Sequence, residues 1–246
     1  MPLFCVQISG QLKVVRYYPQ FQEAFAITKR LVAEQCALTD DMRATVAAAK
    51  TCDDVYAVVR RDMWVTTPTH STVSPGRTME GTRLTIQAKP PDGYDFTIRT
   101  PGTPERWGHF SEELDWVWRQ LCAEARAETR SPKRLAVLVL TSYFYWVNMG
   151  PLTRGSAAVG LAVLVGQAMA CDLPLSLPCP PGKQLDWIGI LSPSPAKFIA
   201  RAMPLVFAAL VDDGAAATPN ALPLPSVTAV FPTTRQAVQA LNLPRV

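Results

Sequence analysis

The sequence predicts a mainly α-helical protein, a helical bundle that carries one β-hairpin, and two observations predict it. Most of the first 212 residues fall into stretches whose apolar side chains recur every three or four positions, which is typical of amphipathic helices. Residues 83–100 instead alternate apolar and polar side chains around a Pro-Pro-Asp-Gly turn. We therefore expect one helical domain over residues 1–212, with the hairpin at about 83–100, and a proline- and alanine-rich tail over residues 213–246.

Three helices are expected before the hairpin. Residues 19–36 carry the apolar stripe of an amphipathic helix. Residues 38–50 begin with Thr39 or Asp40 as the N-cap, because a short polar side chain there accepts a hydrogen bond from a free backbone N–H. Residues 51–62 place two aspartates in a first helical turn, where carboxylates suit the positive end of the helix dipole.

The hairpin should have one apolar and one polar face. Successive side chains of a strand point to opposite faces, so Leu84 and Ile98 share the apolar face. Arg83 and Arg99 then lie on the opposite face, if the turn sets the register of the two strands.

Helices resume after the hairpin. Ser111 is expected to cap a helix that runs to Glu128, and Ser131 caps the next one, with Pro132 at its first position. Three further helices are expected at about 153–170, 183–191 and 194–211. Pro204 should kink the last of them, since proline cannot donate the backbone hydrogen bond of a helix interior.

Two long, mostly apolar runs, 135–153 and 155–182, flank Arg154, and Asp172 is the one charged residue within them. Runs of this length are candidates for membrane-spanning helices. Polar residues within the first run and prolines at the end of the second favour a helical hairpin buried in a soluble core. A membrane-embedded subunit stays an alternative.

Composition excludes several other classes of function. The six cysteines form no Cys-x-x-Cys pair and only two histidines accompany them, so we expect no metal site and no cofactor, and free thiols in an intracellular, cytoplasmic setting. The N-terminus lacks the pattern of a secretory signal. The net charge of +4 is not concentrated in runs of lysine and arginine, and there is no strong nucleic-acid signal.

The turn around Arg154 is the candidate site. The first N–H groups of a helix are free and carry partial positive charge. Thr153 and Ser156 add hydroxyl groups, Gly155 permits close approach, and Arg154 adds a guanidinium that can bind an anion through two hydrogen bonds. Together they predict a site for a phosphate or a carboxylate. The alternative is that Thr153 merely caps the helix and Arg154 pairs with a local acid.

Polar residues on and beside the hairpin extend this candidate site. Arg83 and Arg99 could converge with Arg154 on an anionic ligand, and Glu80 precedes them. Arg106 follows the hairpin and is another polar group of this kind. The alternative is that the strand arginines only solvate an exposed sheet face. His70 and His109 are the conventional general bases near neutral pH, but their spacing to other groups selects neither, so the catalytic residues stay unknown.

Three segments carry a resemblance to a known family: "PGRTMEGTRLTI…GYDFTIRTPGTPERW" (75–107), "MGPLTRGSAAVGLAVLVG" (149–166) and "KQLDWIGILSPSPAKFI" (183–199). Over residues 15–200 the chain resembles the C-terminal region of the tetratricopeptide repeat protein thirteen family. The plant homologue of that family is a negative regulator of effector-triggered immunity. The helical repeats that precede this region in those proteins are not found here, so roles attributed to the repeats are not implied.

A second resemblance concerns the turn. A hairpin followed by Pro151, Leu152 and Gly155 at a helix start is similar to Fic-type nucleotidyl and phosphoryl transferases. Those enzymes place a histidine where this chain has Gly150, and Asn-Gly-Arg where it has Ser156 and two alanines, so the resemblance does not imply their chemistry. We therefore expect a binding or assembly module with a protein partner. The expected small-molecule ligand, if the anion site forms, bears a phosphate. The alternative is an enzyme, a Fic-like transferase.

Overall fold

The computed structural model describes residues 20–88, 94–99, 103–152, 155–176, 179–180 and 182–211. All of them belong to one compact unit, Met1–Ala215. The second unit, Ala216–Val246, lies outside the described residues, so the tail predicted at 213–246 and the domain predicted at 1–212 stay predictions.

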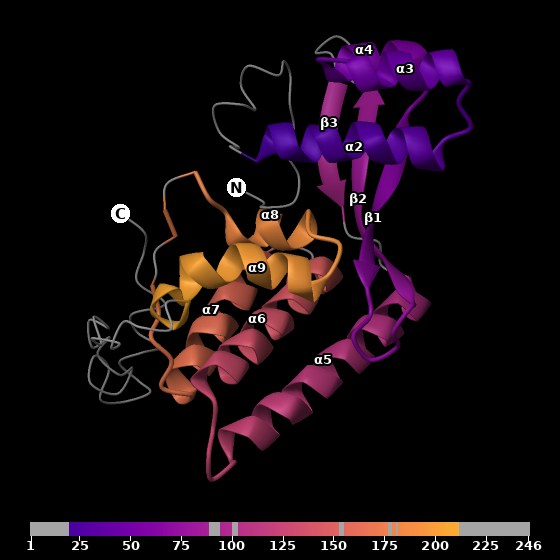
Figure 1. Cartoon of the computed structure of the whole chain (residues 1–246). Helices are drawn as coiled ribbons and strands as arrows, with labels where there is room; N and C mark the ends of the chain where they lie inside the picture. The colour runs from indigo at the N-terminus through magenta and orange to yellow at the C-terminus, as the bar shows by residue number, and fades with distance from the viewer. Residues whose placement is uncertain are drawn as a thin grey trace, which may run out of the picture. The chain divides into compact units, whose positions relative to one another are not determined.

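The first three helices lie where the sequence predicts them: α2 (Phe21–Gln35), α3 (Asp40–Ala48) and α4 (Cys52–Val59) (Figure 1). Thr39 caps α3 by accepting a hydrogen bond from the N–H of Met42. At the start of α4, the N–H of Lys50 donates to the Asp54 carboxylate at 2.8 Å, and this bond, followed by those from Thr51, lowers the pKa of Asp54. Both caps satisfy donors that the helix leaves free.

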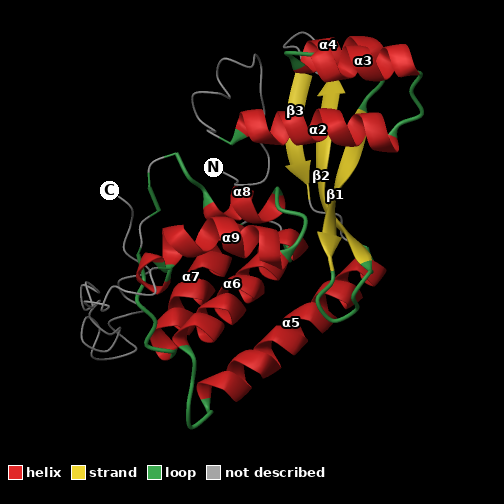
Figure 2. Cartoon of the chain, in the orientation of Figure 1, coloured by secondary structure: helices red, strands yellow, loops and turns green. Residues whose placement is uncertain are grey.

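The predicted hairpin is confirmed and belongs to a three-stranded antiparallel sheet in the order β1 (Met63–His70), β2 (Thr78–Ala88), β3 (Tyr94–Arg99) (Figure 2). Leu84 pairs with Ile98 and Arg83 with Arg99, which is the register that the alternation predicts. The first strand, β1, is an addition that the sequence analysis did not predict. Its register against β2 shifts between Thr66 and Pro68, and proline interrupts the strand pattern by which such a segment is recognised.

The outer edge of β1 is closed by its neighbours. The Gln35 side chain at the end of α2 donates to the Thr66 carbonyl at 2.9 Å and accepts from the Thr66 N–H at 3.0 Å. The N–H of His70 donates to the carbonyl of Pro193, and Pro68 has no N–H to offer. An edge with its polar groups satisfied in this way does not invite pairing with another strand.

The second half of the described chain is helical (Figure 2). Its elements are α5 (Pro104–Ala125), α6 (Pro132–Met149), α7 (Ser156–Ala170), α8 (Leu185–Ile190), α9 (Pro195–Val206) and a 3₁₀ turn, η1 (Ala208–Leu210). Helices α5, α7, α8 and α9 all contact α6. Accordingly, α6 buries the aromatic run Tyr143, Phe144 and Tyr145 in the core.

The observed caps confirm one predicted helix start and correct another. Ser131 caps α6, because its hydroxyl accepts from the N–H of Arg134, and Pro132 opens the helix as predicted. The prediction that Ser111 caps α5 is wrong: α5 begins at Pro104, after Thr103. Its first two turns are held by burial of Arg106 and Phe110, contacts that no local sequence signal shows. His109 therefore lies within α5, and His70 ends β1.

The apolar core consists of two clusters. The sheet cluster lies between α2, α3, α4 and the sheet, and includes Phe21 and Leu84. The bundle cluster lies among α5, α6, α7 and α9, and includes Phe144 and Phe198. The short helix α8 contributes to both.

Within the described ranges, no helix combines the length and the apolar composition that a bilayer crossing requires.

Candidate functional site

The two central residues of the predicted anion site, Thr153 and Arg154, lie outside the described residues. Gly155 is the N-cap of α7, with a backbone φ of 82° that favours glycine. Ser156 is buried, and its hydroxyl accepts from the N–H of Leu152 at 3.0 Å and donates to the Leu152 carbonyl at 3.1 Å. The Ser156 hydroxyl thus closes the turn, and the anion site stays a prediction.

The hairpin residues of the predicted site form a local group. The Arg83 guanidinium bonds to the Glu80 carboxylate at 2.9 Å and stacks over the Trp64 ring at 4.0 Å. Arg99 pairs with Arg83 through the backbone, and its side chain lies outside the described part of the structure. The described partners of Arg83 are therefore a carboxylate and an exposed indole, which supports the alternative of a solvated sheet face.

The structure does connect the hairpin to the end of α6, through Arg106, which the sequence places among the polar groups beside the hairpin. Arg106 of α5 donates from Nε to the Glu80 carbonyl at 2.9 Å and from Nη1 to the Met149 carbonyl at 2.9 Å. Its Nη2 donates to the carbonyl of Asn148, and the guanidinium lies over the Phe110 ring at 4.7 Å. Arg106 therefore joins β2 to the last turn of α6, where free carbonyls carry partial negative charge.

Burial governs the charge state of this guanidinium. Arg106 is 3% exposed, and desolvation lowers its pKa to about 10, although the nearby Glu80 acts in the opposite direction. The side chain therefore stays protonated at neutral pH and donates from all three nitrogens. This cation connects separate elements of the fold through backbone acceptors.

Asn148 continues the same polar junction. Its Nδ2 donates to the Phe144 carbonyl at 3.0 Å and to the Gly189 carbonyl of α8 at 3.2 Å, and its Oδ1 accepts from the Thr69 hydroxyl at 3.4 Å. One buried amide thus connects β1, α6 and α8. Because each of its groups is satisfied, the junction specifies one arrangement of these elements.

A second buried polar group, Glu113 of α5, holds the loop between β1 and β2. Its carboxylate accepts from the N–H groups of Thr72 and Val73, at 2.9 and 3.2 Å, and from the Ser71 hydroxyl. Arg77, at the end of the same loop, donates to Glu113 at 3.5 Å. A carboxylate that receives this many hydrogen bonds orders the loop.

We expect Glu113→Gln to destabilise the protein by about 1.5–3 kcal/mol, because the amide removes the charge and turns one acceptor into a donor that faces other donors. Equilibrium urea unfolding measures the change. Glu112→Gln is the matched control: Glu112 is its exposed neighbour and bonds to the same Arg77 at 2.9 Å, and its loss should cost at most about 1 kcal/mol. Equal losses for the two variants would contradict the anchoring role.

A sequence signal existed for both of these α5 residues. The buried positions of α5 are Arg106, Phe110, Glu113, Val117 and Leu121, which are spaced by three or four residues. Extending the apolar stripe of this helix toward the N-terminus therefore places an arginine and a glutamate on its buried face. Charged residues at such positions are paired or hydrogen-bonded in folded proteins.

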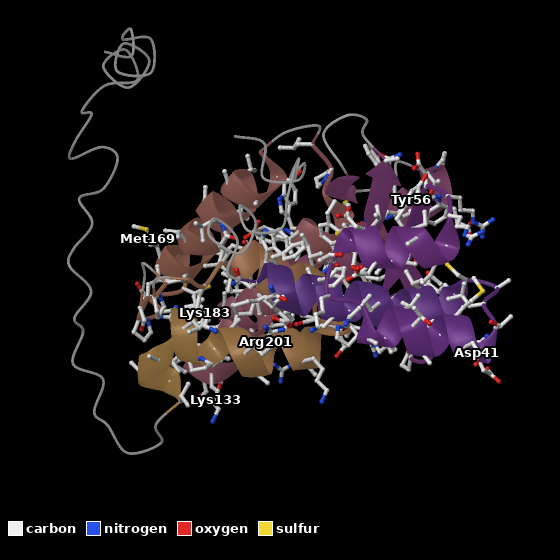
Figure 3. The ribbon with its side chains drawn as sticks, turned by 90° about the horizontal axis from the view of Figure 1, so that it is seen from above. Asp41, Tyr56, Lys133, Met169, Lys183 and Arg201 are labelled. Atoms are coloured by element: carbon white, nitrogen blue, oxygen red, sulfur yellow. The ribbon has the colours of Figure 1, made fainter. Side chains whose placement is uncertain are left out.

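One face of α7 leaves apolar side chains exposed on the described surface. We name it the exposed α7 face: Ala158, Val159, Leu161, Ala162, Val163, Gly166, Met169 and Ala170. Its four large side chains are 38–46% exposed, and the sequence of α7 contains no charged residue. Figure 3 shows Met169 pointing away from the ribbon. Contiguous exposed apolar surface of this kind makes the exposed α7 face a candidate interaction surface.

The opposite face of α7 explains why the exposed one stays open. The buried residues of α7, which include Gly160 and Leu164, lie on that opposite side, and α7 packs against α6. A Cβ on Gly160 would lie 2.5 Å from the Trp146 ring, so the two helices approach closely there. With that side filled by α6, the helix turns its other apolar side outward.

Nothing in the described residues marks a metal centre, since no group of three histidine, cysteine or acidic side chains there could hold an ion. The cysteines at 36, 52, 122, 171 and 179 are free thiols. Burial raises the pKa of the Cys179 and Cys171 thiols, which makes them poor nucleophiles at neutral pH. The predicted intracellular setting stays a prediction.

No family model matches the chain. Suppressor of RPS4-RLD 1 of Arabidopsis thaliana is 35% identical to it over 210 residues, which are 78% of this chain and 20% of that protein. Tetratricopeptide repeat protein 13 of Homo sapiens is 27% identical over 139 residues, 54% of this chain and 16% of that protein. The chain thus spans no more than a fifth of the length of either relative. The resemblance seen in the sequence is confirmed, and this chain is a relative of the tetratricopeptide repeat protein 13 family and of its plant suppressor homologue.

Proposed function

We propose that this chain is a protein-interaction module that docks through the exposed α7 face onto the helices of a tetratricopeptide-repeat partner. The observation that carries the proposal is the exposed α7 face itself, an uncharged apolar surface in a chain with a net charge of +4. Burying apolar surface gains about 25 cal/mol per Å², so a partner that covers this face is favoured.

The shape of the face favours a helix as the occupant. Ala158, Ala162, Gly166 and Ala170 follow one another at intervals of four residues. They form a shallow line of small residues between larger side chains, and Val159 and Leu161 are among those neighbours. Ridges on a helix surface also follow the i±4 spacing, so the ridge of another helix can pack along this row of small residues. The absence of charge indicates that the partner surface is uncharged as well.

The relatives support helical repeats as that partner. The name of the human relative says that it is a tetratricopeptide repeat protein, and this repeat is a pair of helices about 34 residues long. An array of such repeats ends in a helix whose apolar face must be covered. The relatives are at least five times longer than the matched segment, so in them the array and this module would belong to one chain. The same contact could equally form between two separate chains.

Ala162→Glu tests the proposal, because it places a carboxylate in the middle of the exposed α7 face without touching the core. The probe is the purified tetratricopeptide-repeat segment of the human relative, immobilised for biolayer interferometry. We expect the native chain to bind it and Ala162→Glu to bind at least about 10-fold more weakly, since a buried unpaired charge is costly. Ser111→Glu, at an exposed position of α5, is the control and should bind like the native chain.

Three outcomes would overturn this function. The native chain and Ala162→Glu could bind the repeat segment equally or not at all. Sedimentation could show self-association that Ala162→Glu abolishes, in which case a second copy covers the face. Co-flotation with phosphatidylcholine–phosphatidylserine vesicles that Ala162→Glu abolishes would instead assign the face to a lipid surface.

A further inference from the structure

The helix α8 occupies an unusual position, because every one of its six residues is buried. Leu185 and Ile188 belong to the bundle cluster, whereas Trp187 and Ile190 belong to the sheet cluster. Asn148 of α6 also donates to the carbonyl of Gly189. The two apolar clusters therefore meet at α8, and any change in the stability of α8 acts on both.

An acidic residue lies within this helix. Asp186 is 6% exposed, and its Oδ2 has no hydrogen-bond partner. The backbone N–H groups of Trp187 and of Asp186 itself favour the charged form, but burial outweighs them and raises the pKa of Asp186 to about 6. A carboxylate in apolar surroundings without a cation is costly to ionise.

The groups that face Asp186 do not relieve this cost. Tyr143 of α6 lies near Asp186. Burial raises the pKa of the Tyr143 hydroxyl most strongly, and the charges of Asp186 and then of Cys179 raise it further. The two cations of α9, which also contacts α8, lie elsewhere: Lys197 is exposed, and Arg201 bonds to Glu23 of α2 at 2.7 Å. Among the described residues, no charged side chain shifts the titration of Asp186.

We propose that Asp186 is a proton-binding site that controls how firmly α8 is held between the two clusters. When Asp186 carries a proton, the helix buries a neutral acid and both clusters stay closed around it. When the proton leaves, the buried carboxylate favours states in which α8 opens to water. This control of α8 is independent of the exposed α7 face and of its partner.

The direction of the pH dependence follows from linkage. Opening returns Asp186 to its ordinary pKa of 3.8, whereas the closed state holds the pKa at about 6. The stabilisation by the proton is therefore fully present below about pH 4 and is lost as the pH rises through 6. Across that window, the equilibrium constant for opening should rise about 10-fold per pH unit, or roughly 100-fold in total.

Hydrogen exchange of the full chain tests the proposal. The reporters are the N–H groups of Ile188, Leu191 and Ser192, which donate to the carbonyls of residues 184, 187 and 189. After correction for intrinsic exchange, we expect these amides in the native chain to open roughly 100-fold more often at about pH 7 than at about pH 4. In Asp186→Asn the opening should not depend on pH and should be rarer than in the native chain at about pH 7.

Two comparisons keep the result interpretable. Asp54→Asn removes an exposed cap carboxylate whose pKa is shifted in the opposite direction, and it should leave the exchange of α8 unchanged. A carbon-detected NMR titration of the native chain reads Asp186 without any substitution. The same pH dependence of α8 exchange in the native chain and Asp186→Asn, or an Asp186 midpoint near 3.8, overturns the proposal.

Discussion

Arg106→Met is expected to destabilise this protein by about 3–5 kcal/mol, because it removes the donor of two buried carbonyl groups and of one that is partly buried. These acceptors belong to Glu80, Asn148 and Met149, and two of the three lie in the last turn of α6. Methionine retains a flexible apolar chain that can still lie over Phe110, so the loss measures the hydrogen bonds and the charge more than the packing.

Equilibrium denaturation monitored by circular dichroism and by fluorescence measures this loss, and coincident transitions would justify a two-state free energy. Arg83→Met is the control, since that arginine is partly exposed and bonds to one carboxylate beside Trp64. Its removal should cost at most about 1 kcal/mol. A loss below about 1 kcal/mol for Arg106→Met would show that water or other groups replace the donors.

Gly81→Ala is expected to cost about 3 kcal/mol, because the added methyl group has no room. A Cβ at Gly81 would lie 2.5 Å from the backbone carbonyl of Thr67, and 2.6 and 2.7 Å from the hydroxyls of Thr67 and Thr69. The Thr67 hydroxyl cannot easily rotate away, because it accepts from the Thr82 N–H at 2.8 Å and donates to the Thr82 carbonyl at 3.2 Å. The glycine therefore permits the close approach of β1 to β2 where their register shifts.

Gly108→Ala is the matched control for this substitution. Gly108 lies within α5, and a Cβ there meets nothing within 4 Å. The same chemical change should stabilise the protein by about 0.5–1 kcal/mol, since alanine is the better helix former. Thermal unfolding of both variants reports the two signs in one experiment, and an increase in stability for Gly81→Ala would refute the proposed strand contact.

Local interactions made much of the fold predictable. The Ser131 cap, the Thr39 cap and the pairing of Leu84 with Ile98 each depend on residues close in sequence or across one turn. Such interactions act before any tertiary contact forms, so periodicity and capping chemistry were sufficient to find them. The strand β1 was missed because its proline breaks the strand pattern. The contact that closes its outer edge comes from Gln35 of α2, 31 residues away in the sequence, so no local pattern shows it.

The candidate site, like the fold, was predictable only in part from the sequence. The uncharged composition of α7 can be read from the sequence, but which of its sides faces water depends on where α6 packs. The hydroxyl of Ser156, one of the groups of the predicted anion site, bonds to Leu152 within its own turn. Arg83 likewise has described partners in Glu80 and Trp64.

By itself, the sequence determined the helices, the caps of α3 and α6, the hairpin register and the kinship to the tetratricopeptide repeat protein 13 family. Only the tertiary structure decided that Arg106, Glu113 and Asp186 are buried, and that one apolar side of α7 is left uncovered. The physical reason is the range of the forces. Caps and periodicity act over a few residues, whereas the cost of burying a charge and the exposure of an apolar face depend on which distant elements cover them.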